Sequence, residues 1–166
     1  NQGVAQDYIY ESRPQQRTQH SIFGLIKRHL DESVIDFSYR YTTDDWDIDT
    51  HTLDFRWRLF SGGGNYWEPH IRFYQQSAAD FYSTYLVQGE NLPEYVSADY
   101  RVGEMSSMTL GIKYGFQLNN GQNAEIRLEY YRQTPKSASL ERVSGLDNLD
   151  LYPELDAVYL QMNYYF

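Results

Sequence analysis

The sequence predicts an all-β fold, an antiparallel up-and-down meander of about seven strands with one apolar and one polar face. Apolar and polar side chains alternate with a period of two in seven stretches, which is the repeat of a β-strand. Aromatic residues make up 17% of the 166 residues, although the mean hydropathy is −0.69. No run of about 18 apolar residues is present, so we expect no transmembrane helix. This combination suits a transmembrane β-barrel wall, in which every second residue meets lipid.

The first four predicted strands are 20–30, 33–43, 50–60 and 66–76. The first is the least regular, because Arg28 interrupts its apolar face while Phe23 and Leu25 fall on its polar face. The other three alternate clearly. Their residues predicted to face lipid are Ile35, Phe37, Tyr39, Leu53, Phe55, Trp57, Trp67, Ile71 and Phe73.

The last three predicted strands are 106–118, 123–134 and a closing strand, 158–166. Their residues predicted to face lipid are Leu110, Ile112, Tyr114, Ile126, Leu128, Leu160, Met162, Tyr164 and Phe166. A final strand that ends in Phe resembles the closing strand of bacterial outer-membrane barrels. The resemblance implies recognition by the barrel-assembly machinery and a bacterial outer-membrane location.

The predicted connections alternate between short and long. Residues 31–32, 61–65 and 119–122 are short turns, two of them Gly-containing. Residues 43–49, 77–105 and 135–154 form the other set, and the last two are long and polar. Outer-membrane barrels place short turns on the periplasmic side. In that orientation the aromatic residues fall near two rims, as membrane interfaces select.

An odd number of strands leaves an open edge, which is costly in lipid. Residues 4–10 are one candidate for an eighth strand. The alternative, which we prefer, is that the chain supplies part of a larger barrel, with residues 1–17 forming a polar outer loop. In either case residues 1–166 are expected to belong to a single barrel domain.

Particular stretches resemble the C-terminal half of an uncharacterised family of Gram-negative outer-membrane proteins, a domain of unknown function. They are 7–14 (DYIYESRP), 17–21 (RTQHS), 39–41 (YRY), 44–46 (DDW), 51–53 (HTL), 68–74 (EPHIRFY), 76–82 (QSAADFY), 97–101 (SADYR) and 114–115 (YG). The resemblance spans nearly the whole chain. It implies a location and a longer barrel, and it brings no site residues or activity.

The polar faces carry acids and bases on neighbouring strands. The residues expected to line the barrel interior are Lys27, Asp36, Arg40, Asp54, Arg56, Arg58, Glu68, His70, Arg72, Lys113, Glu125, Arg127 and Glu129. One interpretation is cross-strand ion pairing that fills the interior. The other is a charged pore lining that binds or selects a polar solute, in which the group of Arg40, Arg56, Arg58 and Arg72 favours anions.

Other candidate sites are weaker. Asp44, Asp45, Asp47 and Asp49 could attract a hard cation, but a solvated acidic loop is the expected reading and no metal site is predicted. His20 with Ser21, or His51 with Asp49, could suggest a hydrolase, but no nucleophile motif supports it, so an enzyme is not expected.

The stretch 77–105 is too apolar for a free surface loop. We expect it to extend the two flanking strands outward; a plug in the barrel interior and a docking surface for a partner protein are the alternatives.

The net charge of −9 argues against nucleic-acid binding, and the absence of Cys excludes disulfides and thiolate metal sites. We expect no cofactor. The expected function is a channel or transport component for small polar solutes. The alternative is a non-conducting barrel that anchors an envelope complex, and an outer-membrane hydrolase is a third possibility. The expected partners are the lipid bilayer, lipopolysaccharide, the barrel-assembly machinery and an envelope protein.

Overall fold

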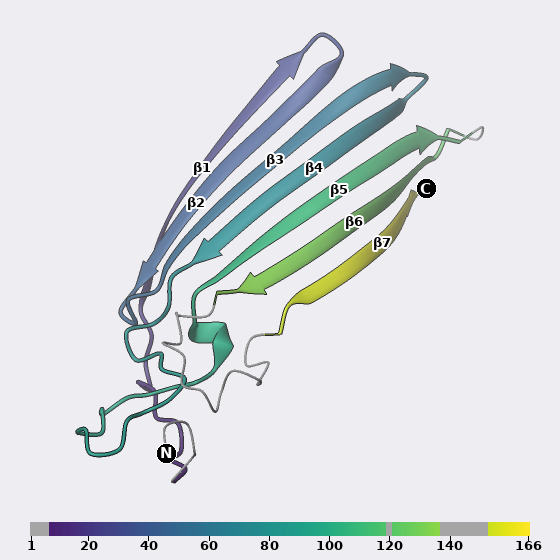
Figure 1. The fold of residues 1–166 in the computed structure, drawn as a ribbon. Coiled ribbons are helices and arrows are strands. Elements are labelled where there is room, and N and C mark those ends of the chain that lie inside the picture. Colours follow the sequence, from purple (N-terminus) through teal and green to yellow (C-terminus); the bar gives the residue numbers. More distant parts are fainter. Residues whose placement is uncertain (1–6, 119–120, 137–152) are drawn as a thin grey trace.

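The computed structural model describes residues 7–118, 121–136 and 153–166 as one antiparallel sheet with strand order β1-β2-β3-β4-β5-β6-β7 (Figure 1). The strands are β1 (Gln19–Leu30), β2 (Ser33–Asp44), β3 (Asp49–Gly62), β4 (Asn65–Gln76), β5 (Met105–Gln117), β6 (Asn123–Pro135) and β7 (Leu155–Tyr165). A single 3-10 turn, η1 (Tyr100–Val102), is the only helical element in the described residues. The predicted seven-stranded meander is therefore confirmed.

The strand register aligns the period-two patterns of neighbouring strands. Phe37 lies opposite Phe55, Phe55 opposite Ile71, and Ile71 opposite Leu110. Because side chains alternate between faces, this register collects the apolar residues on one face, the apolar face, and the charged residues on the other, the polar face.

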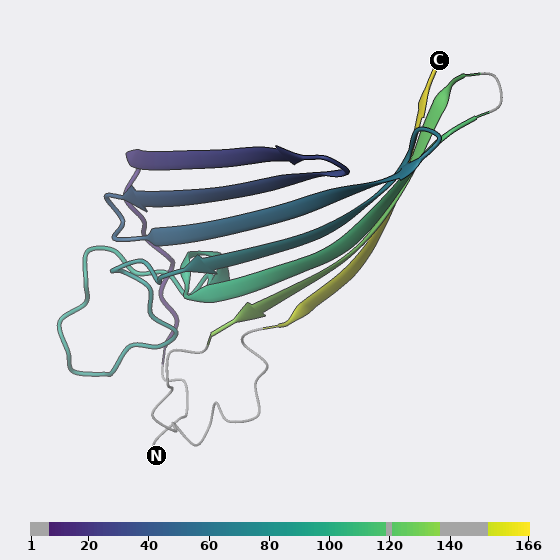
Figure 2. The same ribbon diagram turned by 90° about the horizontal axis from the view of Figure 1, so that it is seen from above.

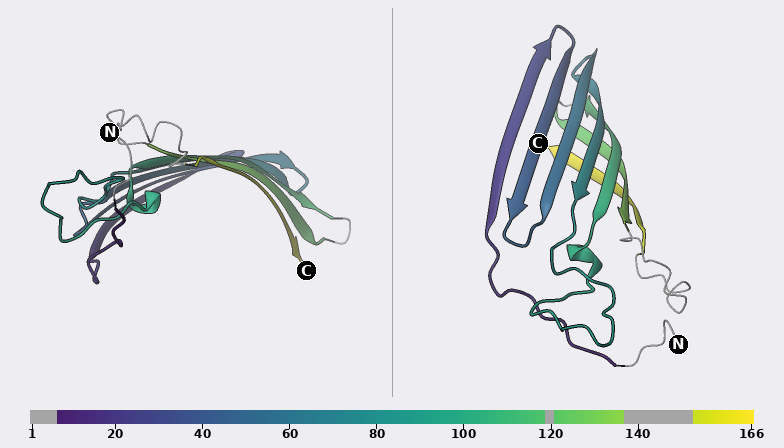
Figure 3. Two further views of the ribbon diagram at one scale, coloured as in Figure 1. Left: turned by 60° about the horizontal axis from the view of Figure 1, so that its bottom comes forward. Right: turned by 60° about the vertical axis from the view of Figure 1, so that its left-hand side comes forward.

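The sheet is arched, and its polar face is the concave one. Gln76, on the polar face, donates from its Nε2 to the carbonyls of Arg101, within η1, and of Gly103, directly after it. Figure 2 shows the sheet from above, and the left panel of Figure 3 shows its curvature, with η1 on the inner side of the arch. Concave curvature crowds the polar side chains together, and it splays the apolar ones apart.

Short turns occupy one end of the sheet, the short-turn end. Leu30 pairs with Ser33, which leaves a two-residue turn between β1 and β2. The β3–β4 turn has positive φ at Gly62, Gly63 and Gly64, a backbone that glycine adopts without strain. At the β5–β6 turn Gly121 has φ +82°, and residues 119–120 of this predicted turn lie outside the described residues. The chain also ends here, at Phe166 (Figure 1).

The opposite end of the sheet carries a folded cap, and the prediction that 77–105 extends β4 and β5 is wrong. β4 ends at Gln76 and β5 begins at Met105. Between them the chain packs a small core of Ile48, Ala79, Phe81 and Val102, with Trp46 and Tyr82 against it. Residues 77–104, together with 11–18 and 45–48, are called the cap below (Figure 3, right panel). The apolar residues of this stretch bury one another, so they do not continue the sheet. Residues 137–152 of the other predicted long connection lie outside the described residues.

The sheet is open, since β1 and β7 each pair with one neighbour. The predicted eighth strand at 4–10 is not formed by residues 7–10, and residues 4–6 lie outside the described residues. None of the helical structure in the described residues has the length and apolar character to cross a membrane.

Candidate functional site

The concave polar face brings together the charged residues predicted to line a barrel interior. The register sets Asp36 opposite Arg56, and Arg56 opposite His70. Glu68 lies opposite Lys113, which in turn faces Arg127. Their neighbours Arg40, Asp54, Arg58, Arg72, Glu125 and Glu129 lie on the same face. The residues predicted to face lipid lie on the convex side.

Near the short-turn end, a tyrosine network links β3, β4, β5 and β6. Glu68 accepts two ion pairs, one from Arg58 at 2.7 Å and one from Lys113 at 3.0 Å. The side chains of Glu68 and Lys113 are each 8% exposed. Arg58 and Lys113 also lie over the Tyr66 ring, at 4.4 Å and 5.4 Å from its centroid. Both cations are thus held by a carboxylate and a π face.

Tyr66 crosses β5 because Gly115 leaves room for it. The Tyr66 hydroxyl donates to Glu125 on β6, which also accepts from Asn163 and Tyr165 on β7. A Cβ at Gly115 would lie 2.2 Å from Cε1 of Tyr66. The missing side chain is therefore what lets one ring span from β4 to β6.

A second arrangement, the histidine network, occupies the middle of the face. His70 Nε2 lies 3.0 Å from Asp54 Oδ2, and its Nδ1 lies 2.9 Å from Glu129 Oε1. Glu129 reaches His70 across β5 above Gly111, where a Cβ would lie 2.7 Å from the Glu129 Cγ. Arg56 pairs with Asp54 at 3.4 Å. In both networks, a glycine of β5 thus leaves room for a side chain that crosses this strand.

Two carboxylates flank the His70 ring, one at each nitrogen. Either ring nitrogen of an imidazole can donate or accept, depending on where the ring is protonated. The triplet of Asp54, His70 and Glu129 thus joins β3, β4 and β6.

A groove opens between β1 and β4 on the same face. It has a volume of about 530 Å³ and is lined by Phe23, Leu25, Lys27, Asp36, Ser38, Arg40, Thr52, Asp54, Arg56 and Arg72. Lys27 pairs with Asp36 at 3.3 Å. Arg40 and Arg72 have no carboxylate partner within 4.0 Å among the described residues. The four arginines predicted to form one anion-favouring group therefore differ. Arg56 and Arg58 are each paired with a carboxylate, which leaves Arg40 and Arg72 as the candidates for binding an anion.

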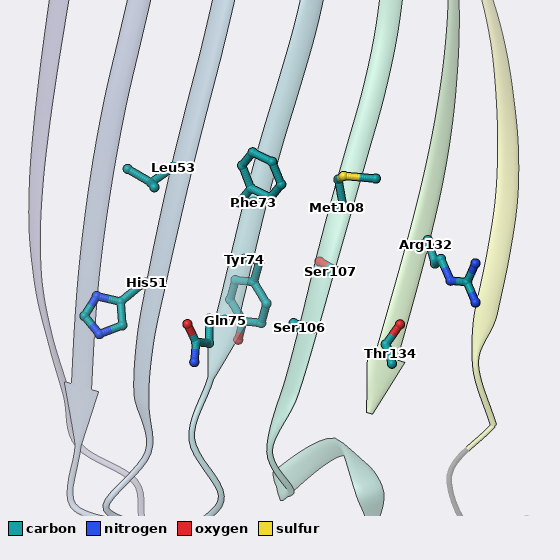
Figure 4. A pocket seen from close by; sticks show the side chains of 10 residues that line it. All are labelled: His51, Leu53, Phe73, Tyr74, Gln75, Ser106, Ser107, Met108, Arg132 and Thr134. Carbon is teal, nitrogen blue, oxygen red and sulfur yellow. The ribbon is translucent and has the colours of Figure 1, made fainter. Parts of the chain in front are cut away.

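The apolar face carries a shallow hollow of about 370 Å³ near the cap end (Figure 4). Leu53, Phe73 and Met108 project into it from three adjacent strands, and His51 lies at its edge. The His51 ring is bonded to the Tyr39 hydroxyl at 2.7 Å and contacts Tyr41. This hollow combines apolar strand side chains with a polar rim.

The hydrolase pairings considered from the sequence do not form a catalytic arrangement in the structure. His20 and Ser21 are successive residues of β1 and so project to opposite faces. Asp49 accepts from Tyr41 and, through its backbone N–H, bonds Ser77, while His51 contacts Tyr39. Neither histidine is placed between a nucleophile and a carboxylate.

The expectation of a solvated acidic loop at 44–49 is wrong for its first residue. The Asp44 side chain is 1% exposed, pairs with Arg17 at 2.5 Å and accepts from the backbone N–H of Trp46 and Ile48. Asp45 accepts from the N–H of Thr18. The described residues hold no cluster of three His, Cys, Asp or Glu side chains that could bind a metal. These acids instead close the loop and anchor the preceding chain.

The cap is held by a second set of charges. Asp99 binds Arg101 at 2.6 Å and Arg13 at 2.9 Å. Hydrogen bonds from Arg101, and then from Arg13, hold the pKa of the Asp99 carboxyl well below its usual range. Arg13 and Ser97 likewise lower the pKa of Glu11. Residues 11–18, before β1, are thereby bonded to the rest of the cap.

Sequence reasoning missed Tyr66 and the role of two glycines. Gly111 and Gly115 lie four residues apart on the polar face of β5, between strands rich in long polar side chains. Glycine inside a strand often marks a close approach of another group. That spacing was the available signal for side chains that cross β5.

No curated protein and no solved structure matches this chain. A family model matches residues 1–166, the full length of the sequence. The family is described as "Protein of unknown function (DUF3570)", in agreement with the expected membership of an uncharacterised family. The chain belongs to this family.

Proposed function

We propose that this sheet is part of the wall of a bacterial outer-membrane β-barrel whose polar interior conducts small polar solutes. One observation carries the proposal: large apolar side chains stand half-exposed on the convex face across the strands. Phe55, Ile71 and Leu110 lie side by side there, and Phe37, Trp57, Trp67, Phe73 and Leu128 are each 39–49% exposed. A patch of this kind is costly in water and favourable in hydrocarbon.

The strand lengths suit a bilayer. The described strands have 11 to 14 residues. At about 3.3 Å per residue, the 13 residues of β5 extend about 43 Å, or about 30 Å across a membrane at a tilt of about 45°. This exceeds the apolar band of about 25 Å typical of outer-membrane barrels. Trp67, Tyr114 and Phe116 stack near the short-turn end, where an interfacial belt is expected.

The open edges support closure by further strands. In hydrocarbon each unpaired backbone group costs several kcal/mol, so β1 and β7 need partners. β1 and β7 run in the same direction, because they are the first and seventh strands of a meander. A second copy of the same seven strands would meet them in parallel. An odd number of additional strands closes the wall with antiparallel pairs throughout.

Conduction is supported by the chemistry of the concave face. A wall whose only task is anchoring can fill its interior with ion pairs, as the tyrosine network does. In the groove between β1 and β4, Arg40 and Arg72 instead have no carboxylate partner in the described part of the chain. Unpaired charges on an inner wall attract solute ions.

The test is single-channel recording with the intact protein in planar bilayers. We expect discrete conductance steps that are absent from mock preparations of an empty strain. Flotation with outer-membrane vesicles and resistance to carbonate extraction test the location separately. A bilayer that stays silent at high protein load removes the channel, whereas extraction by carbonate removes the integral barrel.

A non-conducting anchor is the second candidate, and the tip of the cap favours it. Val87 and Leu92 are 53% and 69% exposed there, away from the small core. Exposed apolar residues on an ordered loop are typical of a docking surface. Crosslinking from residue 92 in cells, combined with a silent bilayer, would select this candidate over the channel.

A further inference from the structure

We propose that the groove between β1 and β4 is a binding site for a small organic anion, one that carries a carboxylate beside an apolar or aromatic portion. The inference rests on the proposed function and names the solute class that the polar face takes. It depends on two unpaired arginines, an excess of positive charge, and an apolar wall.

Arg72 has no ion pair among the described residues because the carboxylate opposite it, that of Asp54, already binds two other groups. Asp54 lies directly opposite Arg72 in the register. The Asp54 carboxylate is instead bonded by His70 at 3.0 Å and paired with Arg56 at 3.4 Å. The other direct neighbour of Arg72 is Thr109, which carries no charge. The Arg72 guanidinium therefore keeps its donors for a ligand.

Arg40 has uncharged neighbours on both sides. It lies between Phe23 on β1 and Thr52 on β3. Its guanidinium is 5.1 Å from the centroid of the Phe23 ring, a cation–π contact that positions the group and leaves its edge donors open. Planar guanidinium edges bind carboxylates in a bidentate manner.

The charges of the groove do not balance. Four cationic side chains line it, Lys27, Arg40, Arg56 and Arg72, against the two acids Asp36 and Asp54. The acids pair with Lys27 and Arg56, so the excess resides on Arg40 and Arg72. The lining thus presents the guanidinium donors of these two arginines to an anion.

The spacing of the two arginines and the apolar side chains of β1 define the class of ligand. Arg40 and Arg72 are two strands and two residues apart, which places their Cα atoms about 12 Å apart. Phe23 and Leu25 face the same groove from β1 and are 54% and 57% exposed. These are the residues that made the first strand irregular in the sequence. They supply an apolar surface beside the cationic one, which suits an amphiphilic anion and not an inorganic ion.

The test uses benzoate as the probe, with neutral benzamide of the same shape as its control. On the intact protein in planar bilayers, benzoate is titrated against the chloride current, for wild type, R40Q, R72Q and R40Q/R72Q. R28Q is the matched control, since Arg28 lies on the apolar face and has no ion pair among the described residues. We expect benzoate to block, benzamide not to block, and the double variant to need about ten-fold more benzoate, because charge-assisted bonds are lost. R28Q should match wild type.

The outcomes separate this inference from the proposed function. A conducting protein whose block by benzoate is unchanged in R40Q/R72Q overturns the site and leaves the channel standing. If no conductance is found, benzoate binding is measured by saturation-transfer NMR on the detergent-solubilised protein. Binding that R40Q/R72Q loses and R28Q retains supports the site in a non-conducting barrel, whereas no binding overturns it.

Discussion

The two halves of the concave face handle charge in opposite ways. Between β3 and β6, Arg58 and Lys113 both bind the carboxylate of Glu68, on a platform made by Tyr66. Between β1 and β4, Arg40 and Arg72 have no carboxylate partner among the residues that the structure describes. Both regions have the same alternating sequence pattern. The difference shows that the type of residue alone does not distinguish a structural ion pair from a binding residue. The distinction depends on whether a carboxylate partner lies beside the cation.

The physical basis of the contrast is competition for carboxylates. Asp54 could serve Arg72, but His70 and Arg56 occupy it. Glu68 has no such competitor and accepts two cations. We therefore expect changes in the tyrosine network to alter stability and changes in the groove to alter binding.

The largest expected effect is from Glu68→Gln. It leaves Lys113, 8% exposed, with a charge that no carboxylate balances, which typically costs about 3–5 kcal/mol. The measurement is urea unfolding of the protein in lipid vesicles, followed by tryptophan fluorescence. The double variant E68Q/K113Q removes the stranded charge and should recover most of the loss. A cost below about 1 kcal/mol for the single variant would show that water already screens this pair.

Gly115→Ala comes next. Its Cβ would lie 2.2 Å from the Tyr66 ring, so the ring must leave and its bond to Glu125 is lost. We expect a cost of about 1–3 kcal/mol in the same unfolding measurement. Gly24→Ala on β1 is the matched control, because no atom lies within 4 Å of the added Cβ. Equal effects at the two positions would argue against Tyr66 as the link across β5.

The Asp99 interactions should contribute about 1 kcal/mol to the stability of the cap, and this contribution depends on pH. Because the pKa of Asp99 is lowered by folding, its contribution is complete above the unfolded value of about 3.9 and is lost as the pH falls through the folded value. We expect the cap to loosen below about pH 4, seen as faster proteolysis at 85–95 by pepsin and as a change in the fluorescence of Trp46, which packs against Phe81. Asp99→Asn should flatten this profile below about pH 4. A profile that D99N leaves unaltered would assign the transition to other carboxyls.

The smallest expected effect on stability is from Arg72→Gln. Arg72 has no ion pair to lose among the described residues, so the free energy of unfolding should change by no more than about 0.5 kcal/mol. Arg58→Gln is the comparator, because Arg58 binds Glu68 and stacks on Tyr66, and it should cost more. If R72Q destabilises the protein as much as R58Q does, the distinction between the two halves of the face is lost.

Most of the fold was predictable from the sequence, whereas less of the site was. The period-two pattern located all seven strands and their two faces, because the alternation of side chains along a strand is a local property. The short turns then determined the order of pairing. The pattern could not show that 77–104 forms a cap. Its core unites Ile48 with Phe81 and Val102, which are far apart in the chain and carry no periodic signal.

The amino-acid sequence by itself determined which residues share a face, since that depends only on backbone geometry and register. Tertiary structure alone decided which charges are matched. Tyr66 reaches Glu125 and His70 reaches Glu129 across an intervening strand, and both contacts exist because a glycine of β5 leaves the space. The spacing of the two glycines marks where β5 can be crossed, but the partners themselves, two strands apart, are chosen by the reach of side chains over a curved surface.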